Sequence, residues 1–62
     1  MSVPAITHVA RPQVYLHRLP AGEDRRIRHR AECAHCRWVY ENTVKTDVEQ
    51  HAQMHRHAHR AA

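Results

Sequence analysis

The chain has 62 residues and a formal net charge of +4, and only 15 of its side chains are Val, Ile, Leu, Met, Trp or Tyr. A chain this short buries too little apolar surface to fold stably unless a disulfide, a metal or a partner supports it. The size argues against a catalytic cleft, so we expect no enzyme and no small-molecule substrate. No apolar run is long enough for a membrane span, and no secretion signal opens the chain, so we expect a cytoplasmic protein.

The first half of the chain predicts a lead-in and a β-hairpin. Residues 1–12 contain two prolines and read as a partly flexible lead-in. Residues 13–19 (QVYLHRL) are rich in β-branched and aromatic side chains and predict a strand. Residues 20–24 (PAGED) predict a turn, and residues 25–32 (RRIRHRAE) predict a second strand.

The second predicted strand is strongly basic. Residues 25–32 hold four Arg and one Glu, and the whole chain has nine Arg but only one Lys. Strand alternation places Arg26, Arg28 and Arg30 on one face of the hairpin. Such a cluster attracts phosphates or carboxylates, although the Arg- and Ala-rich, Lys-poor composition is also typical of a GC-rich bacterium or its phage.

The second half predicts a short strand and a helix. Residues 37–40 (RWVY) form a short apolar stretch and predict a third strand. After them the spacing of the apolar residues changes to that of a helix, which ends near residue 60. The helix could begin at Thr46, with Glu49 completing a capping box, or one turn earlier at Asn42 or Thr43. One helix face would carry the side chains Val44, Val48, His51, Ala52 and His55. We expect one domain over residues 13–60 and a frayed tail at 61–62.

Cysteine and histidine spacing indicates a metal site. Cys33 and Cys36 are separated by two residues, and fourteen residues lie between Cys36 and His51. His51 and His55 lie one helical turn apart. Two thiolates and two imidazoles suit a tetrahedral Zn²⁺ ion and close its coordination sphere. His57 is an alternative to His55 as the fourth ligand. A redox role for the Cys pair is less favoured, because no βαβ pattern surrounds it.

Residues 31–56 resemble a two-cysteine, two-histidine zinc finger of the ββα type. The resemblance rests on the Cys pair, on Tyr40 four residues after Cys36, on Val48 three residues before His51, and on the His pair. The gap of fourteen residues exceeds the family's usual twelve. Bacterial finger regulators of the Ros type also embed one finger in a larger domain. The resemblance implies a small α+β, metal-stabilised domain: β-hairpins followed by one C-terminal α-helix, with an added N-terminal strand or hairpin and one structural zinc ion.

Two functions remain open from the sequence. The first is binding of nucleic acid, duplex DNA rather than RNA, through a basic face. The candidate contacts are Arg25, Arg26, Arg28, Arg30, Arg37, Gln50 and Arg56. If the finger resemblance is aligned on His51, the positions that read bases would be Val44, Asp47 and Gln50. The alternative is a protein-interaction module that docks on a larger host protein, with Trp38 or Val39 as an exposed anchor.

Overall fold

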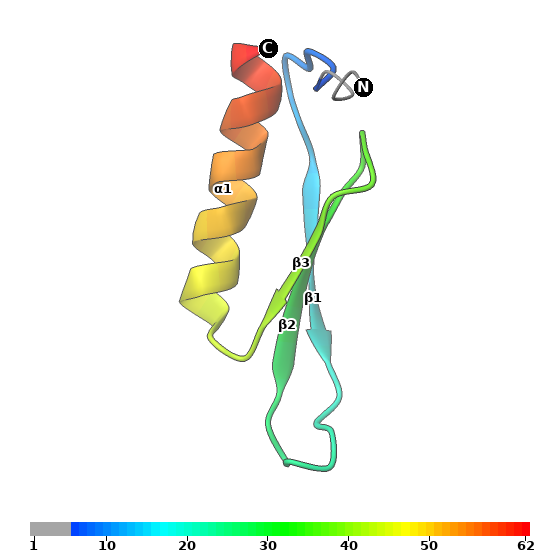
Figure 1. Cartoon of the computed structure of the whole chain (residues 1–62), viewed down its shortest axis with the longest axis vertical. Coiled ribbons are helices and arrows are strands. Elements are labelled where there is room, and N and C mark those ends of the chain that lie inside the picture. The colour runs from blue at the N-terminus through cyan, green and yellow to red at the C-terminus, as the bar shows by residue number, and fades with distance from the viewer. Residues whose placement is uncertain (1–5) are drawn as a thin grey trace, which may run out of the picture.

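The computed structural model describes residues 6–62. Three strands, β1 (Val14–Leu19), β2 (Arg28–Cys33) and β3 (Val39–Asn42), form an antiparallel sheet in the order β1-β2-β3. Helix α1 (Lys45–Ala61) follows and covers one face of this sheet (Figure 1). The predicted class is therefore confirmed: a small α+β domain with hairpins first and one C-terminal helix. No helix within residues 6–62 is long and apolar enough to cross a membrane.

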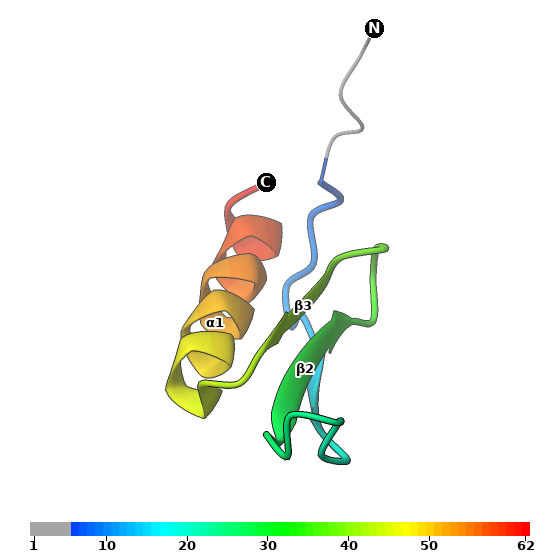
Figure 2. The ribbon, with the colours of Figure 1, turned by 60° about the horizontal axis from the view of Figure 1, so that its bottom comes forward.

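The sheet register separates an inner face from an outer face. Ala31, at the middle of β2, pairs with Leu16 on one side and with Tyr40 on the other. Residues directly opposite each other point to the same face, so these three side chains face the helix. The neighbours of Ala31, Arg30 and Glu32, point to the outer face, which no helix or strand of the described residues covers (Figure 2).

The core is very small. In the part of the chain that the structure describes, the hydrophobic core consists of four buried residues from β1, β2 and α1: Val14, Ala31, Val48 and Ala52. Cys33, Trp38 and Tyr40 are partly buried against them. Trp38 and Tyr40 therefore belong to the inner face, whereas Val39 between them is 45% exposed on the outer face. Two of the four buried apolar residues are alanines, so little apolar area stabilises the fold.

The helix begins between the two predicted starts. Its N-cap position is Val44, whose side chain cannot cap, so the capping box proposed for Thr46 is not formed. Asn42, at the end of β3, orders the turn that leads into the helix: its Oδ1 accepts from the backbone N–H of Thr43 (2.7 Å) and of Val44 (3.4 Å). Its Nδ2 donates to the Asp47 carboxylate (2.6 Å), which ties the first helical turn to the strand.

The two turns that connect the strands lie at opposite ends of the molecule. At one end the β1–β2 turn approaches the start of α1, and at the other end the turn after β2 lies beside the last turns of α1 (Figure 1). Residues 6–12, the described part of the predicted lead-in, run beside the end of the helix, while residues 1–5 lie outside the described residues. Ala61 is the last residue of the helix and Ala62 is its C-cap.

Candidate metal centre

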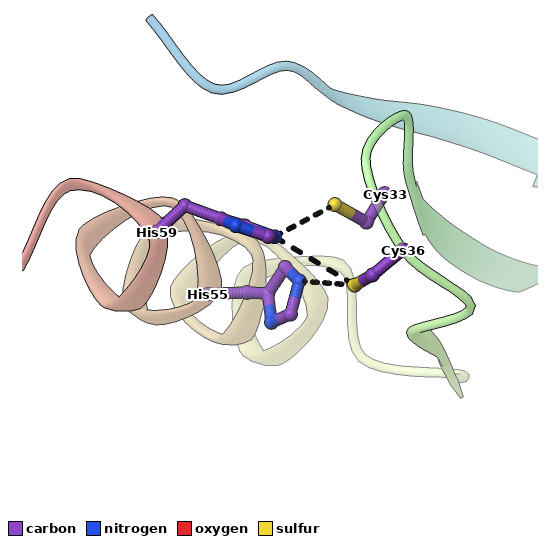
Figure 3. Close-up of side chains that lie close together, drawn as sticks. All are labelled: Cys33, Cys36, His55 and His59. Carbon is purple, nitrogen blue, oxygen red and sulfur yellow. Dashed lines mark hydrogen bonds between the residues drawn. The ribbon is translucent and has the colours of Figure 1, made fainter. Parts of the chain in front are cut away.

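The turn after β2 brings two thiols together. The backbone N–H of Cys33 donates to the Trp38 carbonyl (3.1 Å) and closes the loop that contains both cysteines. The backbone N–H of His35 donates to the Cys33 Sγ (3.3 Å), a contact that favours a thiolate at this sulfur. The tight Cys-x-x-Cys turn thus presents two sulfurs on its concave side, toward the helix (Figure 3).

Two histidines of α1 meet these sulfurs. The Nε2 atom of His55 lies 3.2 Å from the Cys36 Sγ, and the Nε2 atom of His59 lies 3.3 Å from the Cys33 Sγ and 3.6 Å from the Cys36 Sγ (Figure 3). The four ligand atoms all lie within 4.8 Å of one another. His59 is fully buried, and His55 stacks on Trp38 with ring centroids 4.3 Å apart. Both rings are therefore held in place by packing.

The donor geometry fits a tetrahedral metal ion. Bonds of about 2.3 Å to sulfur and about 2.0–2.1 Å to nitrogen place neighbouring S and N ligands about 3.5 Å apart. The three sulfur–nitrogen distances given above lie close to this value. The single lone pair of the His59 Nε2 faces two sulfurs, and a hydrogen bond could satisfy only one of them. A cation among the four atoms satisfies them all.

The protonation equilibria of the four groups differ. Burial alone would raise the pKa of Cys33, but hydrogen bonds, led by that from the His35 N–H, bring it below its ordinary value. Burial raises the pKa of Cys36, and the neighbouring Cys33 raises it further. Burial, and then the charge of His59, lower the pKa of His55. The Thr7 carbonyl, which accepts from the His59 ring, raises the pKa of His59.

The structure replaces His51 by His59 in the predicted ligand set. The His51 ring stacks on Tyr40 with centroids 3.9 Å apart, and its Nδ1 donates to the Asp47 carbonyl (2.8 Å). His57, the alternative fourth ligand, is exposed on the outer side of the helix. Three members of the predicted set, Cys33, Cys36 and His55, lie together. The predicted donor types and the His-x-x-x-His spacing also hold, with His55 and His59 as the pair.

The lengths of the strand and of the returning helix explain why His59, and not His51, reaches the sulfurs. Between Cys36 and Asn42 an extended chain advances by up to about 20 Å, at about 3.3 Å per residue. The helix returns antiparallel to this strand at about 1.5 Å per residue, so it needs up to about thirteen residues to regain the level of the sulfurs. A helix that begins at Lys45 reaches that level between His55 and His59, not at His51.

The likeness to a ββα finger holds for the architecture and the donor types. A hairpin turn supplies two cysteines, and the following helix supplies two histidines one turn apart, so the chain has the arrangement of a two-cysteine, two-histidine finger. Eighteen residues, not fourteen, separate Cys36 from the first helical ligand. Comparison of the chain with protein-family models, with curated proteins and with solved structures gives no match.

The predicted basic face is divided in the structure. Arg28 and Arg30 lie on the outer face of β2, where Arg30 forms ion pairs with Glu32 (2.9 Å) and Glu41 (3.6 Å). Arg56 donates to the Val14 carbonyl (3.0 Å). Two other predicted contacts, Arg37 beside the metal centre and Gln50 on the outer side of the helix, are exposed.

Arg25 and Arg26 instead join a groove at the opposite end of the molecule. This groove has a volume of about 650 Å³ and lies between the β1–β2 turn and the start of α1. Four cationic side chains line it: Arg18, Arg25, Arg26 and Lys45. His29 and Thr43 contribute polar atoms, and no carboxylate is among the described residues that line it. Sequence reasoning missed Arg18 and Lys45, because only the pairing of β1 with β2 and the return of the helix bring them to the turn.

Proposed function

We propose that this chain is a zinc-stabilised domain that binds the phosphate backbone of nucleic acid through the basic groove. Two thiolates and two imidazoles are a donor set that zinc prefers. Four protein ligands leave no open position for water or substrate, so the metal has a structural and not a catalytic role. Binding must therefore come from the protein surface.

The basic groove is the observation that carries this proposal. Four cations share about 650 Å³ with no carboxylate among the described lining residues, whereas the Arg residues of β2's outer face stand beside glutamates. Uncompensated cations in a concavity focus a positive potential, and phosphate oxygens are the ligands that Arg and Lys bind in nucleic acids. Lys45 forms only a 3.9 Å exposed pair with Glu49, which competes weakly.

Contact with the backbone is favoured over base reading. When the finger positions are aligned on His55, the first helical ligand, the base-reading positions become Val48, His51 and Met54. Val48 is buried, and His51 is stacked on Tyr40. Only the exposed Met54 remains, and it offers no strong hydrogen bond to a base. We therefore propose salt-sensitive binding with little sequence preference.

The test is a salt titration with fluorescently labelled duplex DNA and zinc-loaded protein. Each phosphate neutralised contributes about −0.9 to the slope of log K against log salt concentration, so three or four groove contacts give a slope of about −3 to −4. Single-stranded and RNA probes of equal length compare the nucleic-acid classes. Absence of binding at about 50 mM salt would contradict the proposal.

A matched pair of triple variants locates the binding surface. The first replaces Arg18, Arg26 and Lys45 by Gln, and the second replaces the exposed Arg28, Arg37 and Arg60 by Gln. Both variants lose three positive charges, so an effect of net charge alone would weaken the DNA affinity of both equally. The proposal requires a loss of affinity and a shallower salt slope in the first variant, with a smaller change in the second. Equal losses, at unchanged zinc stoichiometry, would show that net charge and not the groove drives binding.

Protein docking is the second candidate, and the outer sheet face favours it. Tyr15 of β1 and Val39 of β3 point to this uncovered face and are 50% and 45% exposed. Aromatic and apolar side chains in the open are frequent anchors of protein interfaces. In this case Tyr15→Ser and Val39→Ser would abolish partner binding without changing the salt-dependent binding of DNA.

A further inference from the structure

The segment of residues 6–13, which we name the N-terminal arm, brackets one metal ligand. The Thr7 carbonyl lies 2.7 Å from the Nδ1 atom of His59, and the Val9 N–H donates to the backbone carbonyl of the same residue (3.1 Å). Residues two apart in the arm thus hold both the side chain and the main chain of His59. Figure 1 shows the arm beside the last turn of α1.

The contact to Thr7 sets the tautomer of the ligand. A carbonyl oxygen can only accept, so the Nδ1 atom of His59 carries the proton and its Nε2 atom has the free lone pair. That lone pair points at the sulfurs of Cys33 and Cys36. Histidines that bind metals usually donate their other ring N–H to such an acceptor, which orients the ring. The Thr7 carbonyl is in the position of this acceptor.

The arm also holds the cysteine turn. The Gln13 carbonyl accepts from the Ala34 N–H (3.0 Å), and the Gln13 N–H donates to the Nε2 atom of His35 (3.0 Å). Pro12, between the two groups of contacts, is buried. One continuous segment therefore touches the turn that supplies the thiols and the helix end that supplies His59. These contacts lie outside the ββα unit formed by β2, β3 and α1.

We propose that the N-terminal arm is an integral part of the metal centre and that arm docking and metal binding form one coupled equilibrium. Without the arm, His59 lacks the acceptor at its Nδ1, and the cysteine turn loses its attachment to Gln13. Because thermodynamic coupling is reciprocal, the metal must order the arm to the same degree that the arm strengthens metal binding. Thr7, Val9 and Gln13 act as positioning residues.

The test compares two variants of the full-length chain at one position. Val9→Pro removes the N–H that bonds to His59, whereas Val9→Ala keeps this N–H and removes only side-chain volume. We expect Val9→Pro to bind zinc about 10–100-fold more weakly than Val9→Ala in competition with a chromophoric chelator, the loss typical of removing support from a metal ligand. Equal affinities of the two variants would overturn the proposal.

NMR of the histidine rings supplies a readout beyond affinity. In the zinc-loaded protein the Nδ1 proton of His59 should exchange slowly, because it is donated to Thr7. Val9→Pro should accelerate its exchange, while the ring signals of His55, which stacks on Trp38, stay unchanged. If Val9→Pro does not fold, the wild-type protein decides: zinc should protect the Val9 and Ala34 amides together. A Val9 amide that exchanges freely in the zinc-loaded protein would overturn the proposal.

Discussion

His59 contacts the cysteine turn and the N-terminal arm at the same time. Its ring is buried, its Nε2 faces both sulfurs, its Nδ1 donates to Thr7, and its main-chain carbonyl accepts from Val9. We predict that His59→Ala lowers zinc affinity by more than the 10–100-fold typical of losing a supporting residue, because it removes a ligand and leaves a cavity. Competition with a chelator measures this loss, and Co²⁺ absorption reports the change in donor set.

His51→Ala is the matched control for that substitution. His51 stacks on Tyr40 and touches none of the sulfurs, so its removal should cost stability without changing zinc stoichiometry or the Co²⁺ spectrum. His57→Ala, at an exposed position, should change neither. A spectrum that changes in His51→Ala and not in His59→Ala would reject the ligand set derived from the structure.

The ligand types could be predicted from the sequence, but the choice among the four histidines of the helix could not. His51, His55 and His59 repeat at intervals of four, so two His-x-x-x-His pairs fit the same pattern. The apolar stripe Val48 and Ala52 continues through His55 to His59 at helical spacing, a signal compatible with the second pair. The deciding quantity was the length of helix needed to return to the sulfurs, and this depends on where the helix begins.

Arg25 offers a test of the groove that avoids a loss of stability. Its φ of 60° is in the left-handed region, where a side chain other than Gly costs about 1 kcal/mol. Arg25→Gly relieves this strain but enlarges the freedom of the unfolded chain, so we expect unfolding free energy to rise by between zero and about 1 kcal/mol. Thermal unfolding of the zinc-loaded protein measures it.

The same substitution should weaken DNA binding, because it removes one of the groove's four cations. Arg25→Ala is its control, since it removes the same charge and keeps the strained backbone. Both should reduce the salt slope by about one. Unchanged DNA affinity in a fully folded Arg25→Gly protein would remove Arg25 from the proposed binding surface.

At the scale of elements, the start of α1 determines the position of every residue that the helix contributes. Asn42 accepts from two backbone N–H groups at this start and also donates to Asp47. We predict that Asn42→Ala lowers the unfolding free energy by about 1 kcal/mol, the usual effect of losing the hydrogen bonds of one polar side chain. Urea unfolding of the zinc-loaded protein, at fixed free zinc, measures the change.

Thr46→Ala is the control, because Thr46 lies inside the first turn and caps nothing. Its effect should stay within about 0.5 kcal/mol, as is usual for an exposed position. A larger loss for Thr46→Ala than for Asn42→Ala would indicate that the helix begins at the capping box after all.

The three strands and the helix could be predicted because their periods differ. Alternating and β-branched residues mark β1 and β2, and Val44 to Ala52 follow the helical period. Which turn begins the helix could not be decided, since Thr46 with Glu49 and Asn42 with its neighbours are both plausible caps. The paired glutamates of the outer face also escaped prediction, because Glu41 reaches Arg30 only across the β2–β3 pairing.

For the whole molecule, the small core makes folding depend on the metal. Among residues 6–62 the hydrophobic core consists of just Val14, Ala31, Val48 and Ala52, while a zinc site of this type contributes about 10–16 kcal/mol near pH 7. We predict that removing zinc with a chelator unfolds the chain and that adding zinc restores it. Near-UV circular dichroism of Trp38 and NMR dispersion report this transition. A dispersed spectrum in excess chelator would contradict the prediction.

Proton binding should oppose folding through the same four ligands. The pKa of Cys36 is raised by burial, and that of His59 is raised by the Thr7 carbonyl, so in the folded arrangement, before a metal enters, both hold protons at a higher pH than usual. A metal ion must displace these protons, hence zinc affinity falls as the pH falls. Cys33 and His55, whose pKa values are lowered, release theirs more readily.

We expect log zinc affinity to rise by one to two per pH unit between about pH 7 and 8, where the thiols are still protonated. The slope should steepen at lower pH, where His59 also holds a proton, so zinc loss and unfolding coincide on acidification. Chelator competition over a pH series gives the slope, and calorimetry in buffers of different ionisation enthalpy counts the protons released. A flat profile between about pH 6 and 8 would mean that thiolates and neutral imidazoles do not bind the metal.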